Sequence, residues 1–134
     1  MIACYCIHLK SNYGSFKADA RRANVEKREM MVRQVLDEMG GGHAGAVIVA
    51  GDFNADRFQP QFMNEPIFTL LEDAGFTDCW LGSQPAERGT HPGSTRYPDS
   101  TLDYIFHRRL PRPKWRRLAP ASTVSDHRMV VVGW

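Results

Sequence analysis

The chain has 134 residues, of which 43% are hydrophobic and 24% are charged, and its formal net charge is +2. These values are typical of one ordinary globular domain, and the charge is too small to indicate a partner by itself. No apolar run approaches the roughly 20 residues that a membrane span needs, and MIACYCIHLK has neither a basic start nor a cleavage site after it. We therefore expect no membrane span and no signal peptide.

The start of the chain predicts a strand and then a long helix. The strand runs from Ile2 to Lys10, and the helix from Ser15 to Met39. Glycines at 40–42 are expected to end the helix. The helix carries an approximate apolar stripe of Ala20, Ala23, Met30, Met31, Val35, Leu36 and Met39 among charged residues.

The next segment predicts a second strand and a short helix. Residues 46–51 form the strand, and Glu65 to Ala74 form the helix. Asn64 is the expected N-cap, Pro66 falls in the first turn, and Gly75 lies just past the end.

The rest of the chain predicts several strands around a polar loop. Phe76 to Leu81 is expected to be extended, and the loop continues to about Ser100. Strands are expected at Thr101 to His107 and Arg128 to Trp134, with Lys114 to Leu118 as an edge strand. This order predicts an α/β fold: a mixed β-sheet with helices packed on one face.

The three cysteines show no recognisable metal or redox spacing. Cys4 and Cys6 share a face of the first strand, and Cys79 stands alone. We expect reduced thiols packed in the core, which favours the cytoplasm.

Residues 47–56 read VIVAGDFNAD, so an apolar strand ends in a polar cluster. The unalternated β-branched run predicts a strand covered on both faces. Gly51 permits a turn or a close backbone approach, and Asp52 and Asn54, two residues apart, point to one side of an extended chain. A carboxylate and an amide at a strand end are typical of an α/β active site, although these residues also favour a simple turn.

Further polar residues fall at other predicted strand ends. His8 lies near the end of the first strand, and TLDYIF places Asp103 inside an apolar strand. Asp126 and His127 directly precede the last strand. Each has an ordinary structural explanation, such as a surface carboxylate, an ion pair or a turn, but together they predict one site.

The residue types in this site suit metal-assisted phosphate chemistry. Asp52, Asn54 and Asp126 offer hard oxygen ligands, which favour Mg²⁺ or Mn²⁺. Such an ion completes its shell with water and substrate phosphate. Attack of water on a phosphate ester then needs a base for the water and stabilisation of the phosphate charge.

The segments GDFNAD, TLDYIF and SDHRMVVV, in this order behind HLKS, resemble the endonuclease/exonuclease/phosphatase superfamily. That group includes deoxyribonucleases, repair exonucleases, sphingomyelinases and inositol phosphatases. The resemblance runs from His8 to Trp134. It implies that residues 1–134 are a single domain corresponding to the C-terminal half of the family domain, or half of a four-layer α/β-sandwich.

The resemblance implies catalytic and metal-binding roles. Asp52 would orient or deprotonate the attacking water, and Asn54 would hold the water and the scissile phosphate. Asp126 would bind the metal together with these two residues. His127 would contact a phosphate oxygen or take part in proton transfer.

The resemblance also implies roles for His8 and Asp103. His8 would contact phosphate or protonate the leaving oxygen. Asp103 would orient a histidine, with His8 as the expected partner, and would raise the pKa of that imidazole. Asp56 is interpreted as a turn residue.

The chain departs from the resembled family in its length. The family domain is about twice as long, and its first half supplies the glutamate that is the principal metal ligand. Glu26, Glu29 and Glu38 lie on the predicted helix, so none is an obvious replacement. The inner face of the sheet would then be uncovered, and we expect two copies to pack sheet on sheet as a homodimer.

Residues 108–117 read RRLPRPKWRR. The segment predicts a nucleic-acid contact, with basic residues on the phosphate backbone and an indole stacked on a base. The same composition suits a solvated edge strand. The candidate substrate-binding residues are Arg108, Arg109, Arg112, Lys114, Trp115 and Arg116.

The resemblance and the basic segment together predict a divalent-metal-dependent phosphodiester hydrolase, first a nuclease acting on DNA by direct water attack. One alternative is a phosphatase acting on a sugar, inositol or lipid head group. The other is a non-catalytic half-domain, which the missing glutamate favours.

Overall fold

The computed structural model describes residues 1–12, 14, 17–40, 45–62, 65–95 and 98–134. Its helices are α1 (Ala18–Gly40) and α2 (Pro66–Asp73), with short 3-10 turns at Pro60–Phe62 and Pro85–Glu87. Its strands are β1 (Ile2–His8), β2 (Ala46–Asp52), β3 (Thr77–Asp78), β4 (Asp103–Arg108), β5 (Trp115–Leu118) and β6 (Val130–Gly133). Among these residues, no helix has both the length and the apolar character needed to cross a bilayer.

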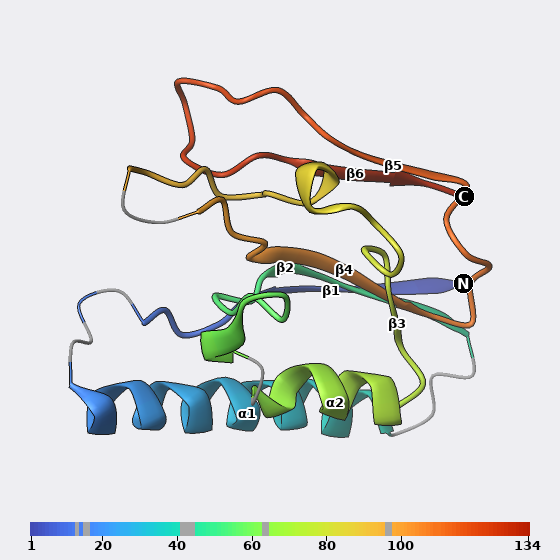
Figure 1. Cartoon of the computed structure of the whole chain (residues 1–134). Coiled ribbons are helices and arrows are strands. Elements are labelled where there is room, and N and C mark those ends of the chain that lie inside the picture. The colour runs from blue at the N-terminus through green and yellow to red at the C-terminus, as the bar shows by residue number, and fades with distance from the viewer. Residues whose placement is uncertain (13, 15–16, 41–44, 63–64, 96–97) are drawn as a thin grey trace.

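Four strands form one mixed sheet in the order β1-β2-β4-β3. β1 and β2 are parallel, so α1 is the crossover between them, whereas β4 runs antiparallel to β2 and β3. β5 and β6 pair as a separate antiparallel ribbon. The two helices lie along one face of the sheet, and the ribbon lies over the other (Figure 1). The predicted mixed sheet with helices on one face is confirmed.

The core lies mainly between the sheet and the helices. Val47 and Val49 of β2 are fully buried, but Ile48 between them is only half-buried. The expectation that both faces of β2 are covered was therefore wrong in part, because the helices cover one face only. Rings from the segment after β2 and from α2 pack together in this core, with the centroids of Phe53 and Phe68 6.3 Å apart.

The other face of the sheet is open along β1. Ile2 is 55% exposed, and Cys4 and Cys6 are exposed. Of the three predicted core thiols, only Cys79 is buried. β1 is an edge strand of the sheet, and the side chains at alternate positions face away from α1.

α1 buries a more polar face than the apolar stripe predicts. Its buried residues are Asn24, Arg28, Val32 and Met39. Met30, placed in the predicted stripe, is 68% exposed. Arg28 can be buried because it forms an ion pair with Glu65 and donates a 2.7 Å hydrogen bond to the Lys10 carbonyl. α1 therefore holds the segment that follows β1.

The remaining elements lie near their predicted positions. Gly75, with a φ of +82°, ends α2 as predicted, and the bond from the Phe76 N–H to the Leu71 carbonyl (3.0 Å) closes the turn. The predicted Asn64 cap lies outside the described residues. β3 and β6 are shorter than predicted because only parts of these segments find a partner strand.

Candidate functional site

Three predicted site residues lie in one row across the sheet. His8 of β1 is opposite Asp52 of β2, and Asp52 is opposite Asp103 of β4. Opposite residues on paired strands point to the same face. Asp52 is three positions from the buried Val49, so this row faces away from the helices. The sheet thus presents two carboxylates and an imidazole at the ends of β1 and β2.

Asp52 and Asn54 form a fixed pair at the end of β2. The carboxylate of Asp52 accepts a 2.8 Å hydrogen bond from the backbone N–H of Asn54 and a 2.9 Å bond from its Nδ2. Nδ2 also donates to the Leu9 carbonyl at 3.0 Å. Asn54 has a φ of +50°, a left-handed conformation that asparagine tolerates well. The ends of two strands therefore orient both side chains.

Gly51 allows β1 and β2 to approach closely beside this pair. Its φ is +145°, and a Cβ at this position would lie 1.9 Å from the Ile7 carbonyl oxygen. A larger residue would open the strand pairing next to Asp52, which explains the glycine before it.

The pKa of Asp52 is raised above its ordinary value, chiefly because the carboxylate is partly buried. The hydrogen bond from the Asn54 backbone opposes this effect, and the nearby Asp103 carboxylate adds to it. A raised pKa makes the carboxylate a better proton acceptor, which suits a general base.

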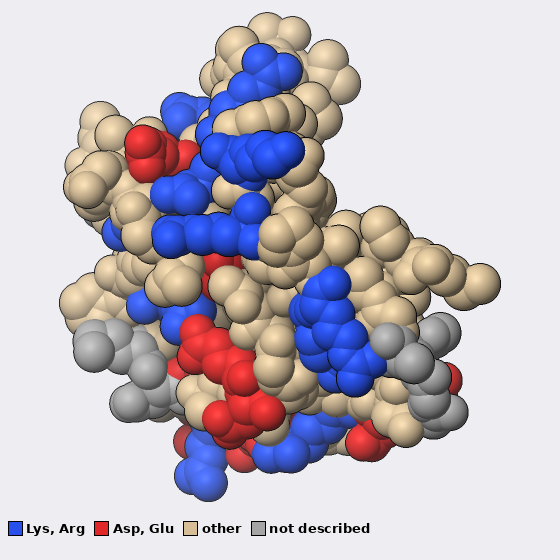
Figure 2. Space-filling view, turned by 90° about the vertical axis from the view of Figure 1, so that its right-hand side faces the viewer, with Lys and Arg blue, Asp and Glu red and all other residues tan. Residues whose placement is uncertain are grey.

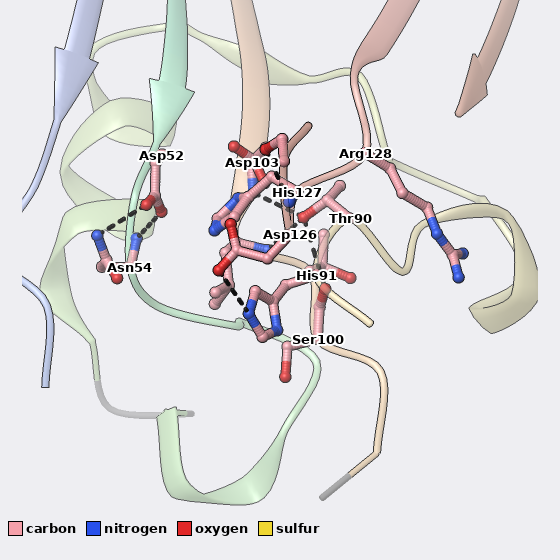
Figure 3. Close-up of polar contacts among 12 residues, drawn as sticks. Asp52, Asn54, Thr90, His91, Ser100, Asp103, Asp126, His127 and Arg128 are labelled. Carbon is pink, nitrogen blue, oxygen red and sulfur yellow. Dashed lines mark hydrogen bonds and ion pairs between the residues drawn. The ribbon is translucent and has the colours of Figure 1, made fainter. Parts of the chain in front are cut away.

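Asp103 pairs with His127 and not with His8, which corrects the prediction. Oδ2 of Asp103 lies 2.7 Å from Nδ1 of His127 (Figure 3). The strand order explains the correction, because β2 lies between β1 and β4 and Asp52 separates His8 from Asp103. His8 lies instead with Nε2 3.5 Å from Asp52, and its side chain is 78% exposed.

The pKa of His127 is raised in the folded chain. Burial is the largest single effect and alone would lower this pKa, but the hydrogen bond and the charge of Asp103, with smaller contributions from Asp52 and Asp126, together outweigh it. Because Nδ1 is engaged by Asp103, Nε2 is the ring nitrogen left for a ligand.

A cavity of about 500 Å³ lies at these strand ends, and Asn54 and His127 both line it. Its lining includes Ser11, Asn12, Asn54, Phe62, His91, Ser100, Asp126 and His127. α1 places one rim of it, because Asn24 donates to the Ser11 carbonyl at 3.1 Å and Arg28 donates to Oδ1 of Asn12 at 3.3 Å. The cavity therefore depends on buried polar residues of α1 that the sequence patterns did not single out.

Two further residues shape the site and were not among the predicted site residues. Thr90 is fully buried, and its Oγ1 accepts hydrogen bonds from the N–H groups of Leu102 (2.9 Å) and Asp103 (3.0 Å). Nε2 of His91 lies 3.8 Å from Oδ2 of Asp126. In the sequence, Thr90 and His91 stand next to each other in the loop before TLDYIF. A single pair of this kind does not by itself predict a site.

Comparison with known protein families identifies the family of the chain. The sequence model of the family described as "Endonuclease/Exonuclease/phosphatase family" matches residues 15–127. The chain belongs to this family. No curated protein matches it significantly.

Solved structures of this family share the fold. A D. rerio TDP2 humanised by 14 mutations is 23% identical, with a TM-score of 0.66 over 98% of this chain and 54% of that one. The endonuclease/exonuclease/phosphatase from Beutenbergia cavernae is 21% identical, with a TM-score of 0.69 over 93% and 33%. A mannosyl-6-phosphatase from Bacteroides thetaiotaomicron is 18% identical, with a TM-score of 0.56 over 96% and 49%. The chain thus spans about half the length of these structures or less.

In this member of the endonuclease/exonuclease/phosphatase family, Asp56 is a turn residue, as interpreted from the sequence. Its carboxylate accepts hydrogen bonds from the N–H groups of Phe58 (2.9 Å) and Thr101 (2.8 Å) and from Nε2 of Gln59 (2.9 Å). These bonds tie the turn after β2 to the segment that leads into β4.

The predicted substrate-binding segment lies at the opposite end of the sheet from the site. Arg108 is opposite Val47 while Asp103 is opposite Asp52, so the two ends of β4 are roughly 17 Å apart at about 3.4 Å per residue. Arg108 donates to the Ala74 carbonyl at 3.2 Å, and Arg112 donates to the Leu81 carbonyl at 2.9 Å. The structure therefore does not bring the set Arg108, Arg109, Arg112, Lys114, Trp115 and Arg116 to the cavity.

That end of the molecule nonetheless carries a basic surface. Seen from the side of the chain termini, Lys and Arg atoms gather over the upper half, where β5 and β6 lie, and Asp and Glu atoms gather below them (Figure 2). Within β5, the guanidinium of Arg117 lies over the ring of Trp115, 5.8 Å from its centroid. This arrangement suits a solvated edge strand as well as a phosphate contact.

The predicted oxygen ligands fit a hard divalent cation. Asn54 and Asp126 line the same cavity, and Asp52 is hydrogen-bonded to Asn54 beside it. Carboxylate and carboxamide oxygens are the donors that Mg²⁺ and Mn²⁺ prefer. Asn54 and Asp126, with Asp52 next to them, are therefore the residues that would hold such an ion.

Proposed function

We propose that the chain carries the hydrolytic site of a divalent-metal-dependent phosphodiesterase that acts on DNA by direct attack of water. One observation carries this proposal: Asp52 and Asp103 are opposite each other on neighbouring strands, and their hydrogen-bond partners Asn54 and His127 line the same cavity. The first pair offers a hydrogen-bond donor to phosphate, and the second offers a base for water.

Each side chain then has a distinct task. Asp52, whose pKa is raised, orients the attacking water and takes its proton, while Asn54 holds the water and the phosphate. His127 donates from Nε2 to a phosphate oxygen, and Asp103 keeps its ring in the required orientation. Mg²⁺ or Mn²⁺, when bound, would polarise the phosphoryl oxygen as a Lewis acid.

The likeness to a DNA-bound structure supports DNA as the substrate. A D. rerio TDP2 complexed with single-strand DNA product is 22% identical and matches 96% of this chain with a TM-score of 0.62. The basic residues of β5 do not line the cavity, so they would not hold the scissile phosphate there. They would instead extend the contact along a longer strand, with a strong dependence on salt.

A phosphatase is the second candidate, and the cavity lining favours it. Among the described residues that line the cavity, none is lysine or arginine. A small sugar phosphate would need fewer backbone contacts than DNA, and the Bacteroides mannosyl-6-phosphatase shares the fold.

The test uses supercoiled plasmid, a labelled single-stranded oligonucleotide and a sugar phosphate, each with Mg²⁺ or Mn²⁺ and with EDTA. We expect metal-dependent cleavage that falls by a factor on the order of 10² or more in Asp52→Ala, because the base is lost. Asp37→Ala, the matched change at an exposed acid of α1, should keep full activity.

The outcome separates the candidates. Cleavage of DNA that survives Asp52→Ala unchanged would mean that the assigned site is wrong. Phosphate release from the sugar alone would support the phosphatase. No reaction with any of these substrates would support the third hypothesis, a non-catalytic half-domain.

We further propose that the open sheet face is covered by a second copy of the chain. The exposed side chains of Ile2, Cys4 and Cys6 form an apolar strip along the edge strand β1. Apolar strips of this kind are typical of interfaces.

A further inference from the structure

We propose that His91, Asp126 and His127 bind a first-row transition-metal ion such as Zn²⁺. This ion would share Asp126 with the oxygen-ligand site, would not need Asp52 or Asn54, and would compete with phosphate for Nε2 of His127. One ring nitrogen from each histidine and one carboxylate oxygen of Asp126 all lie within 4.8 Å of one another. The two imidazole rings approach edge to face, with centroids 5.1 Å apart. The inference does not depend on the proposed hydrolytic activity.

The cluster needs only small side-chain rotations to close on a cation. Zinc–ligand bonds of about 2.0 Å in a tetrahedron place the ligand atoms about 3.3 Å apart. Nε2 of His91 is already 3.8 Å from Oδ2 of Asp126, whose carboxylate points toward that ring (Figure 3). The side chains of His91 and Asp126 are 37% and 80% exposed, so both have room to turn.

His127 is oriented in the way that metal-binding histidines are. Its Nδ1 lies 2.7 Å from Oδ2 of Asp103, which leaves Nε2 for a cation. A carboxylate behind a ligating imidazole fixes the ring and strengthens the ligand, and histidine ligands of zinc almost always have such a partner.

Backbone hydrogen bonds bring the two histidines together before any ion binds. The Arg128 N–H donates to the Thr90 carbonyl at 2.6 Å, so the residues next to His127 and His91 are joined directly. His91 exchanges two backbone bonds of 2.9 Å with Ser100. The ligand positions are therefore fixed by main-chain contacts, with little ordering left for the ion to impose.

The donor set favours zinc-like ions over magnesium. Two imidazoles and one carboxylate suit Zn²⁺, Co²⁺ or Ni²⁺, whereas Mg²⁺ takes mainly oxygen ligands. Three protein ligands also leave one tetrahedral position open, as in catalytic zinc sites. Both histidines and Asp126 line the cavity, so that position would face it.

The experiment titrates the metal-free protein with Zn²⁺ by calorimetry and with Co²⁺ by visible absorption. We expect one ion per chain, with binding weakened at least tenfold in His91→Ala and in His127→Ala, and about 10- to 100-fold in Asp103→Asn. His8→Ala is the matched histidine control, and Asp52→Asn removes the base without touching the cluster. Both should bind Zn²⁺ within twofold of the original chain.

Two results would overturn the proposal. One is equal Zn²⁺ affinity in the original chain and His91→Ala, which would mean that His91 is not a ligand. The other is a loss in Asp52→Asn as large as that in His91→Ala, which would place the ion on the oxygen ligands. Circular dichroism checks that each variant is folded, and His91→Gln replaces His91→Ala if that variant is not.

Discussion

Single carboxylates in this site differ in chemistry because they differ in their partners. Asp52 is held by hydrogen bonds from Asn54, and its pKa rises chiefly because it is partly buried. Asp103 lies 2.7 Å from the His127 imidazole, whereas Asp56 accepts hydrogen bonds within its own turn and from the N–H of Thr101. Residue type alone therefore does not separate the proposed base, the proposed orienting group and the turn residue; their hydrogen-bond partners do.

Asp103→Asn is expected to lower the pKa of His127. Burial lowers the pKa of that imidazole and Asp103 makes the largest contribution that raises it, so removing the charge of Asp103 strengthens the relative effect of burial. An NMR titration of the histidine ring protons measures the change. Asp126→Asn is the matched control and should shift the pKa less, because the contribution of Asp126 is the smallest.

The same substitution predicts a change in stability with pH. A raised folded-state pKa for His127 stabilises the fold fully below the ordinary histidine pKa, and this contribution is lost as pH rises through the folded-state pKa. In Asp103→Asn, the free energy of unfolding should therefore fall less as pH rises through this range. An unchanged pKa in the variant would show that Asp103 does not control His127.

At the scale of elements, α1 both packs the sheet and positions the site. Asn24 and Arg28 point inward and bind the segment after β1, and that segment lines the cavity through Ser11 and Asn12. The helix therefore couples stability to site geometry. Its outward face carries ordinary surface ion pairs, such as Arg33 with Glu29 at 2.7 Å.

Arg28→Met is expected to destabilise the fold by about 3–5 kcal/mol, because it leaves the Glu65 carboxylate buried without its partner. Urea unfolding followed by circular dichroism measures the difference. Arg33→Met breaks an exposed pair on the same helix and should cost only about 0.3–0.5 kcal/mol.

A second variant checks the cause. Adding Glu65→Gln to Arg28→Met removes the unpaired charge and should recover part of the lost stability. Equal losses for Arg28→Met and Arg33→Met would contradict the structural role of the buried pair.

For the whole molecule, the uneven covering of the sheet is the main feature. The helices cover one face, and the β5–β6 ribbon lies over the other without closing it along β1 (Figure 1). Exposed apolar side chains of this kind favour association, and strand β1 also offers an unpaired edge. These two properties underlie the proposed homodimer.

The dimer proposal predicts a molar mass near twice that of the 15.2 kDa chain by light scattering at micromolar concentration. Cys6→Glu places a charge on the open face and should give a monomer, because burying an unpaired carboxylate is costly. Met30→Glu, at an exposed methionine on the outer side of α1, is the matched control and should remain dimeric. A molar mass near 15.2 kDa for the original chain would contradict the proposal.

The sequence by itself determined most of the elements and the sheet class, and it singled out candidate site residues that the fold places close together. Pro66 in the first turn and Gly75 after the end located α2. The polar residues near predicted strand ends singled out Asp52, Asn54, Asp103 and His127. These features are local, so neighbouring residues carry enough information to reveal them. The family segments could be read for the same reason.

Only the tertiary structure decided which groups meet. The order β1-β2-β4-β3 sets Asp52 between His8 and Asp103 and so leaves Asp103 to His127. Burial of Arg28 likewise required Glu65, 37 positions away in the chain. Such pairings depend on long-range strand order and packing, which no local pattern encodes, and this is why the partner of each site residue had to be seen in the fold.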